Sequence, residues 1–309
     1  MSDYRYPERF LGLEDEFTRR ETSAAWILSV PMEMTTCYVG GQRNGPAAII
    51  EASNQVEPYD IHFDNDSARE YGIATLPVLH PNLTSPQAAV ESITEAVKAL
   101  PLEDRVLVTL GGEHTITPGV VAALAPRYDD LMIVQIDAHT DLRDTFDGTP
   151  WSHACAMRRC LPYVSKMIQI GIRCLCREEV DFLRSTDQVQ VFTAEAMHRD
   201  LQGSYLQSMA QAVAGRNVYL TIDLDGLDPS IIPAVGTPEP GGIGWYDCLD
   251  ILTTVATHAH VVAMDCVELA PTLGSQASNF SAARLVYRTL NYIMLERGKL
   301  NTPAIVYGL

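Results

Sequence analysis

Side chains that commonly bind metal ions are concentrated in three short groups of this sequence. These groups are His114; Asp137, His139 and Asp141; and Asp223 and Asp225. In the second group the three side chains alternate with small residues, so in an extended backbone they would point to one side. The third group repeats this spacing, and the first follows a pair of glycines, where the backbone can turn sharply. Two imidazoles and four carboxylates are therefore the candidate metal ligands.

The charge of this set favours two metal ions over one. Four carboxylates carry four negative charges, which two divalent ions balance, whereas a single ion would leave repulsion that a protein interior tolerates badly. Carboxylates with some imidazole suit Mn²⁺ better than the thiolate-rich sites of structural zinc. Two such ions can share a water molecule, lower its pKa and hold hydroxide as a nucleophile. We expect two Mn²⁺ per chain, although a single Asp-x-Asp pair more often caps a helix.

The elements that must position these groups alternate between strand and helix. Apolar, β-branched runs predict strands at residues 26–30, 106–110, 132–136, 167–170, 189–192, 218–222, 261–264 and 304–307. Amphipathic runs predict helices at residues 45–53, 87–99, 118–125, 178–185, 205–212, 245–257 and 281–296. Strands that are apolar on both faces need helices on both sides. The fold class is therefore α/β, a three-layer α/β/α arrangement with a doubly wound, mostly parallel sheet of about eight strands.

Each candidate ligand group follows a predicted strand directly. In an open parallel sheet, ligands bind at the carboxyl ends of the strands, where the loops converge on a crevice. The three groups are therefore expected to meet at one place. No linker, repeat or low-complexity segment divides the chain, so residues 1–309 are expected to form a single domain.

Composition narrows the choice of partners and compartment. Of the 309 residues, 22 are Lys or Arg and 39 are Asp or Glu, a net charge of −17 that disfavours nucleic acid and anionic membranes as partners and attracts cations. The seven cysteines are scattered and odd in number, which is typical of reduced thiols. The N-terminal segment is polar and acidic, unlike a secretory signal, and no apolar run reaches about 18 residues. We expect a cytoplasmic protein.

Several motifs resemble the signatures of the ureohydrolase family, which comprises arginases and agmatinases, in their usual order. They are GGEHTIT (111–117), DAHTDLRD (137–144), SHACAMRR (152–159), TIDLDGLDPS (221–230), GTPEPGG (236–242) and DCVELAP (265–271), with NGPAAIIEAS (44–53) similar to the family's early helix. The resemblance spans about residues 30–290. It implies the family's three-layer α/β fold and hydrolysis of a guanidinium compound to urea and an amine.

The resemblance also implies roles for individual residues. One Mn²⁺ would be held by His114, Asp137, Asp141 and Asp223, and the other by Asp137, His139, Asp223 and Asp225, with Asp137 and Asp223 bridging. Glu268 would bind the substrate guanidinium through paired hydrogen bonds, unless it forms a buried ion pair with an Arg. His153 would contact the substrate and pass protons near the mouth of the site, unless it is a surface or helix-capping histidine. Asp141 would relay the proton from the attacking hydroxide.

The substrate is less well defined by these motifs. Arginases carry an Asn two residues after the third ligand of the DxHxD motif, which helps to hold the amino acid's carboxylate, whereas this chain has Arg143 there, able to meet a carboxylate or pair with Asp144. The segments DLRD and GTPEPGG are closer to the agmatinase branch. Conversion of agmatine to putrescine and urea, a step of polyamine biosynthesis, is the first choice. N1-aminopropylagmatine, guanidinobutyrate and arginine are alternatives.

Two other classes of protein compete with this interpretation. A deacetylase-type amidohydrolase shares a DxH metal motif but would use one Zn²⁺, and a neutral amide would not need the carboxylate of Glu268. A non-catalytic scaffold could keep the fold. It would have no physical need to hold four mutually repelling carboxylates together. The resemblance further implies a homotrimer or homohexamer.

Overall fold

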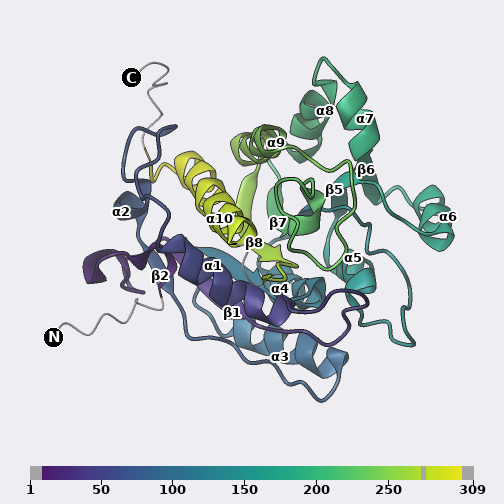
Figure 1. The fold of residues 1–309 in the computed structure, drawn as a ribbon, viewed down its shortest axis with the longest axis horizontal. Helices are drawn as coiled ribbons and strands as arrows, with labels where there is room; N and C mark the ends of the chain where they lie inside the picture. Colours follow the sequence, from purple (N-terminus) through teal and green to yellow (C-terminus); the bar gives the residue numbers. More distant parts are fainter. Residues whose placement is uncertain (1–8, 273–275, 301–309) are drawn as a thin grey trace.

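A single eight-stranded sheet runs through the computed structural model, which describes residues 9–272 and 276–300 (Figure 1). The strands are β1 (Ala25–Val30), β2 (Ile73–Thr75), β3 (Val106–Gly111), β4 (Met132–Ile136), β5 (Lys166–Ile172), β6 (Val189–Thr193), β7 (Asn217–Asp223) and β8 (His260–Val267). Their order is β2-β1-β3-β8-β7-β4-β5-β6, and every neighbouring pair is parallel. The predicted α/β class and parallel sheet are confirmed.

Helices cover both faces of this sheet. They are α1 (Gly45–Ser53), α2 (Ser67–Tyr71), α3 (Pro86–Lys98), α4 (Thr117–Leu124), α5 (Ala156–Cys160), α6 (Arg177–Ser185), α7 (Ala194–Arg199), α8 (Ser204–Val213), α9 (Trp245–His258) and α10 (Ala277–Glu296). Helices α1, α10, α9 and α8 pack side by side on one face, and α3, α4 and α5 pack on the other (Figure 1). None of the helices in the described ranges is long and apolar enough to cross a membrane.

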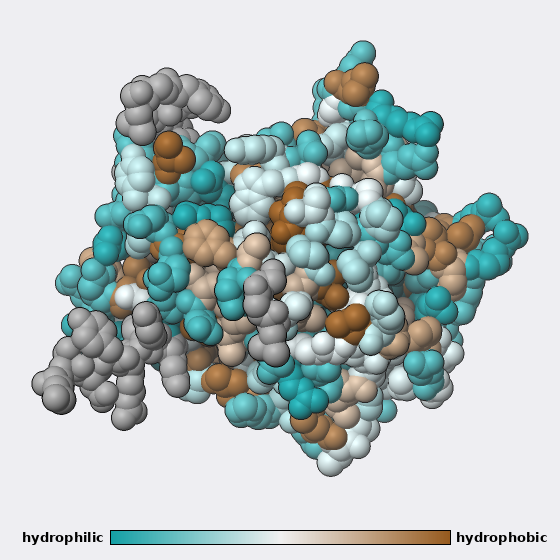
Figure 2. Space-filling view, viewed as in Figure 1, coloured by the Kyte–Doolittle hydropathy of each residue, from teal (hydrophilic) through white to brown (hydrophobic). Residues whose placement is uncertain are grey.

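Alternate residues of the central strands enter the two hydrophobic layers. In β3, Val106, Val108 and Leu110 pack in the layer that holds α1 and α10, whereas Leu107 packs in the layer that holds α3 and α4. All residues of β3 are buried, as a strand covered on both faces requires. On the surface view of Figure 2, apolar residues are scattered among hydrophilic ones.

The secondary structure differs from the prediction mainly in its short elements. Seven of the predicted strands and all seven predicted helices are present, with ends shifted by a few residues. The predicted strand at 304–307 lies outside the described residues. Strand β2 was missed because it has only three residues, and its pairing with β1 at the sheet edge gives no periodicity to read. Helices α2, α5 and α7 were missed for the same reason of length.

The strand order places the candidate ligand groups at one edge of the sheet. Strands β3, β8, β7 and β4 are consecutive neighbours at its centre. The segments that follow these four strands carry His114, Glu268, the Asp223–Asp225 pair and the Asp137–Asp141 group. Because the strands are parallel, their carboxyl ends lie together, which is where open α/β sheets bind ligands.

Candidate metal centre and active-site pocket

The first imidazole, His114, faces three carboxylates. It lies in a 3-10 turn, η4 (His114–Ile116), just after β3. Its Nδ1 is 3.3 Å from Asp137 Oδ2, 3.1 Å from Asp141 Oδ2 and 3.2 Å from Asp223 Oδ2. All four side chains are buried. The structure therefore brings these sequence-predicted residues into one group.

The second imidazole, His139, lies beside the first group and shares Asp137 with it. His139 Nδ1 is 3.0 Å from Asp225 Oδ2 and 3.6 Å from Asp137 Oδ1. Asp225 belongs to the 3-10 turn η8 (Leu224–Gly226) that follows β7. The two oxygens of Asp137 thus face the two imidazoles separately. Asp223 turns Oδ2 to His114, while its Oδ1 accepts a hydrogen bond from the backbone N–H of Asp225.

The backbone of the DAHTD segment is bent rather than extended throughout. Ala138 lies in a bend, and Asp141 has a φ of 52°, in the left-handed region. The N–H of His139 donates to Asp137 Oδ1 at 2.6 Å, and the N–H of Ala138 donates to Asp225 Oδ1 at 3.0 Å. The side chains converge because hydrogen bonds turn the backbone, and the simple alternation expected from the sequence explains only part of the arrangement.

The electrostatics of the cluster require a compensating positive charge. Burial raises the pKa of Asp223 well above its usual value, and the neighbouring charges of Asp225 and Asp137 raise it further. The pKa of Asp141 is raised to about 7, first by burial and then by Asp137. Burial would lower the pKa of His114, but the three carboxylates that face its Nδ1 hold the pKa well above its usual value. No Lys or Arg of the described ranges forms an ion pair with these aspartates.

These residues fit bound divalent metal ions. His114 Nδ1 is buried, and it has no hydrogen-bond partner within the described chain although three carboxylate oxygens surround it. Lone pairs that converge in this way are stable only with a cation between them. The groups His114–Asp137–Asp141 and Asp137–His139–Asp225 each place their ligand atoms within 4.8 Å of one another. Two adjacent positions for a cation are therefore available.

A layer of polar residues behind the ligands was not singled out from the sequence. His114 Nε2 contacts Thr221 Oγ1 at 2.9 Å. Gln135 Nε2 donates to Asp137 Oδ2 at 2.5 Å, and Gln169 Nε2 donates to Gln135 Oε1 at 2.6 Å. The sequence feature that could have identified Gln135 and Gln169 is a polar residue inside an otherwise apolar strand. Both are fully buried in β4 and β5. Such partners orient metal ligands.

Glu268 follows β8 directly and points into the same cavity. Its Oε1 accepts a hydrogen bond from the backbone N–H of His114 at 2.6 Å, and its φ of 68° is unusual for a residue with a Cβ. Burial raises its pKa to about 8. No Arg in the described part of the chain pairs with Glu268, so the alternative of a buried ion pair is not observed. The other acid of this motif, Asp265, accepts from Thr117 and Tyr219 and so anchors the core.

His153 lies across the cavity in the 3-10 turn η6 (His153–Cys155). Its Nδ1 is 3.2 Å from Thr35 Oγ1, and its Nε2 is 3.6 Å from Cys37 Sγ. Its side chain caps no helix; it lines the pocket. Burial lowers its pKa to about 4, and the nearby His139 and His114 imidazoles contribute to this shift.

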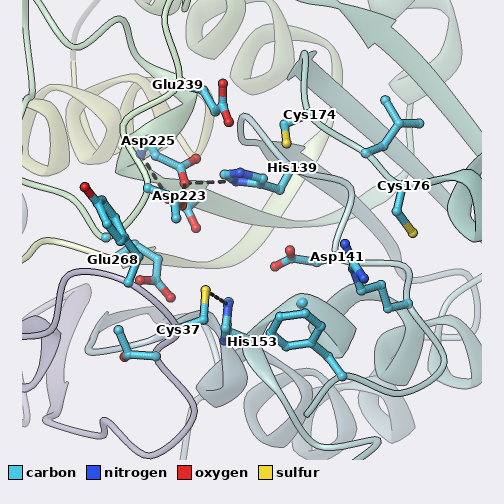
Figure 3. A pocket seen from close by; sticks show the side chains of 18 of the residues that line it. Cys37, His139, Asp141, His153, Cys174, Cys176, Asp223, Asp225, Glu239 and Glu268 are labelled. Atoms are coloured by element: carbon cyan, nitrogen blue, oxygen red, sulfur yellow. Dashed lines mark hydrogen bonds and ion pairs between the residues drawn. The ribbon is translucent and has the colours of Figure 1, made fainter.

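A pocket of about 290 Å³ connects these side chains. Figure 3 shows Asp223, Asp225 and His139 on one side of it, Asp141, His153 and Cys37 on another, and Glu239 with Cys174 above His139. Four of the six proposed metal ligands, the guanidinium-binding candidate and the proton-transfer candidate thus line one space of a size suited to a small molecule.

Arg143 also lines this pocket. The sequence left open whether Arg143 pairs with Asp144, and the structure shows a different arrangement. Asp144 forms an ion pair with Arg159, with Arg159 Nη2 2.8 Å from Asp144 Oδ1. The guanidinium of Arg143 lies over the ring of Phe146, 4.9 Å from its centroid. The alternative in which Arg143 pairs with Asp144 is therefore not observed.

Comparison with known proteins agrees with this fold. A model of the arginase family matches residues 23–291. The N(1)-aminopropylagmatine ureohydrolase of Synechocystis sp. is 37% identical over 292 residues, covering 93% of this chain and 94% of its own length. The agmatinase of Halalkalibacterium halodurans is 32% identical, covering 93% of this chain and 98% of its own. The crystal structure of the agmatine ureohydrolase of Thermoplasma volcanium superposes with a TM-score of 0.80 at 28% identity, covering 94% of each chain.

The chain belongs to the arginase family. Within it, the chain is a ureohydrolase of the agmatinase and arginase type, an enzyme that hydrolyses carbon–nitrogen bonds. Its eight-stranded parallel sheet with helices on both faces is the arginase-like fold.

Proposed function

We propose that this chain is a ureohydrolase with two Mn²⁺ ions that splits a linear guanidine with a cationic tail into urea and an amine. The observation that carries the proposal is the convergence of the buried His and Asp cluster, Glu268 and His153 on one pocket. We further propose that His114, Asp137, Asp141 and Asp223 hold one ion and that Asp137, His139, Asp223 and Asp225 hold the other. When bound, two such ions lower the pKa of water and supply a hydroxide nucleophile.

The chain's own residues orient the substrate and move protons. Glu268 is a buried carboxylate, and the planar guanidinium of the substrate would be its ion partner, aiming the guanidinium carbon at the cluster. Asp141 would accept a proton from the attacking water. His153, which lines the mouth of the pocket as a neutral imidazole, would relay a proton from solvent to the departing amine nitrogen, which is a poor leaving group until it is protonated.

Two related compounds are the proposed substrates. Agmatine is the first choice from the sequence motifs, whereas the Synechocystis relative is named for N(1)-aminopropylagmatine. The net charge of −17 favours a cationic tail. We rank the aminopropyl derivative first, because several relatives of more than 90% coverage carry its name. We also propose a single domain over residues 1–309, a cytoplasmic location and a homo-oligomer.

The decisive experiment measures urea release and metal content on the same Mn²⁺-loaded sample. The compounds are agmatine, N1-aminopropylagmatine, arginine, guanidinobutyrate and an acylated polyamine. Urea from one of the two cationic guanidines, with two metal ions per chain, supports the proposal. Urea released only from arginine or guanidinobutyrate would overturn the proposal that the substrate has a cationic tail. Amine released only from the acylated compound would indicate a deacetylase. No turnover with any compound indicates a scaffold.

A further inference from the structure

Three side chains meet on the pocket wall outside the proposed ligand set. A ring nitrogen of His139, Cys174 Sγ and a carboxylate oxygen of Glu239 all lie within 4.8 Å of one another. In the view of Figure 3, Glu239 and Cys174 lie on the same side of His139, above it. All three side chains are partly buried. Cys174 is fixed beside His139 because the two residues form a parallel β-bridge, with the N–H of Cys174 donating to Ala138 O at 3.0 Å.

The two imidazoles of the centre differ in what lies behind them. His114 presents Nδ1 to carboxylates and Nε2 to Thr221 Oγ1, at 2.9 Å. His139 also presents Nδ1 to a carboxylate, Asp225, at 3.0 Å. Over the described residues, however, the Nε2 of His139 makes no direct hydrogen bond, and Cys174 Sγ and a Glu239 carboxylate oxygen lie within 4.8 Å of a ring nitrogen. A metal-binding His almost always donates its other N–H to a carboxylate, carbonyl or water.

Glu239 is held in place by an arginine that makes only backbone contacts. The guanidinium of Arg173 donates to Glu239 O from Nη2 at 2.8 Å and from Nε at 3.2 Å. The same guanidinium donates to Asp225 O at 2.6 Å and to Gly171 O at 3.1 Å. It therefore ties the loop that carries Glu239 to the turn that carries Asp225 and to the end of β5. These hydrogen bonds anchor the Glu239 backbone close to the cluster.

We propose that Glu239 is a positioning residue for the metal centre: its carboxylate accepts the Nε2–H of His139 and so keeps Nδ1 free for the metal. A small rotation of the Glu239 side chain, or one water molecule, closes a separation of up to 4.8 Å. Glu239 is the acceptor because a thiol such as Cys174 is a weak one. This inference rests on the proposed two-metal centre.

Two other uses of the same three side chains are less consistent with the geometry. A third metal ion between them would have to take Nε2 of His139 while Nδ1 serves the centre, which requires loss of both ring protons. Alternatively, Glu239 could bind the substrate tail. Its carboxylate lies within 4.8 Å of a His139 ring nitrogen, next to the metal cluster rather than at a distance set by a four-carbon tail.

The test compares Glu239→Ala and Glu239→Gln with the wild type and with Asp228→Asn, which loosens the same loop from its other end. Mn²⁺ affinity is measured by competition with a chelator, and kcat and KM are measured for agmatine and for butylguanidine, which lacks the tail amine. We expect Glu239→Ala to lower the affinity for one of the two Mn²⁺ ions by about 10–100-fold, as the loss of a hydrogen-bond partner of a metal ligand does. KM should be unchanged, and kcat should recover in excess Mn²⁺. Glu239→Gln, which keeps an acceptor oxygen, should restore part of the affinity.

The other outcomes overturn the inference in distinguishable ways. A raised KM for agmatine but not for butylguanidine, with unchanged Mn²⁺ affinity, assigns Glu239 to the substrate tail. If Glu239→Ala lowers the affinity for both ions equally, and Asp228→Asn does the same, then Glu239 has a purely structural role. A third tightly bound ion in the wild type that is lost in Glu239→Ala indicates a separate metal site. If the wild type itself releases no urea, the proposed function fails, whereas an active wild type with an unaffected Glu239→Ala refutes only this inference.

Discussion

At the scale of single residues, the centre depends on carboxylates that are unstable without a cation. Asp137 serves both imidazoles, Asp141 and Asp223 face His114, and Asp225 faces His139. Each carboxylate is buried, and burying an unpaired charge costs several kcal/mol. Removal of any one of them therefore changes the number of ions held before it changes the fold.

Asp225→Ala tests the second metal position. We expect this variant to retain one Mn²⁺ per chain and to lose turnover by at least about 100-fold, because one ion alone cannot share a water with a partner. Metal analysis after gel filtration and a urea assay are the measurements. Asp181→Ala, which changes an exposed aspartate of α6, is the control. Full activity with one ion per chain would contradict the two-metal proposal.

Glu268→Gln tests recognition of the guanidinium. The amide keeps an oxygen for the N–H of His114 but removes the charge that would face the substrate. Hydrogen bonds to charged groups contribute about 1.5–3 kcal/mol, so kcat/KM should fall by roughly 10–150-fold. Metal content should be unchanged, which metal analysis on the same sample checks. A variant that loses its metal instead would assign Glu268 to the metal centre.

At the scale of elements, the pocket is built where tight turns leave the carboxyl ends of the central strands. A Cβ on Gly112 would lie 1.9 Å from Met32 O, so the turn between β3 and His114 tolerates only glycine. The loop at residues 236–242 is anchored by Asp228 Oδ2, which accepts from the N–H groups of Gly241 and Gly242, each at 3.0 Å. These local constraints fix the backbone positions from which the functional side chains extend into the pocket.

Gly112→Ala should damage both stability and metal binding. The methyl group must displace the backbone near Met32, and comparable overpacking costs about 1–3 kcal/mol. Unfolding titrations with urea as the denaturant should show a lower free energy of unfolding. The Mn²⁺ affinity should also fall, because His114 moves with the turn. Gly215→Ala is the control: its φ is 69° but no atom lies within 4 Å, so only backbone strain should appear. Equal stability of the two variants would contradict the steric explanation.

Asp228→Asn should reveal a pH-dependent contribution of the 236–242 loop. Hydrogen bonds from Ser230, and then from Gly242 and Gly241, lower the pKa of Asp228 to about 2. Because the folded pKa lies below the unfolded one, this stabilisation is fully present above about pH 4 and is lost as the pH falls towards 2. Solvent screening reduces the expected contribution to about 1 kcal/mol. Unfolding of the metal-free protein at pH 6 and pH 2.5 measures it; a constant difference would contradict the assignment.

At the scale of the whole molecule, the large parallel sheet and the acidic surface are the dominant features. The chain carries a net charge of −17, and apolar residues are scattered on the face of Figure 2. Individual apolar side chains are nevertheless strongly exposed, such as Leu201 at 94% and Tyr246 at 79%. Leu201 also lines a second cavity, which is formed by residues of α7, α8 and α9 and the loops beside them.

The oligomeric state is a prediction at this scale. From the family resemblance we expect a homotrimer or homohexamer, which light scattering coupled to gel filtration measures directly. The chain mass is 34.0 kDa, so the expected assemblies are well separated from a monomer. A monomer at working concentration would contradict the prediction without affecting the fold.

The sequence by itself determined the fold class and which side chains would meet. Strands that are apolar on both faces require helix layers on both sides, and parallel strands bring their carboxyl ends together. His114, the Asp137–Asp141 group and the Asp223–Asp225 pair each follow such a strand, so their convergence could be predicted without knowing the strand order.

Only the tertiary structure decided how those side chains are oriented and supported. The left-handed backbone at Asp141 and the ion pair of Asp144 with Arg159 are features of the folded chain, and the contacts of Arg173 join segments far apart in the sequence. Local patterns carry no information on such contacts, because a side chain's partner is set by strand order and loop packing. The proximity of Glu239 to His139, a hundred residues apart, is therefore visible only in the folded protein.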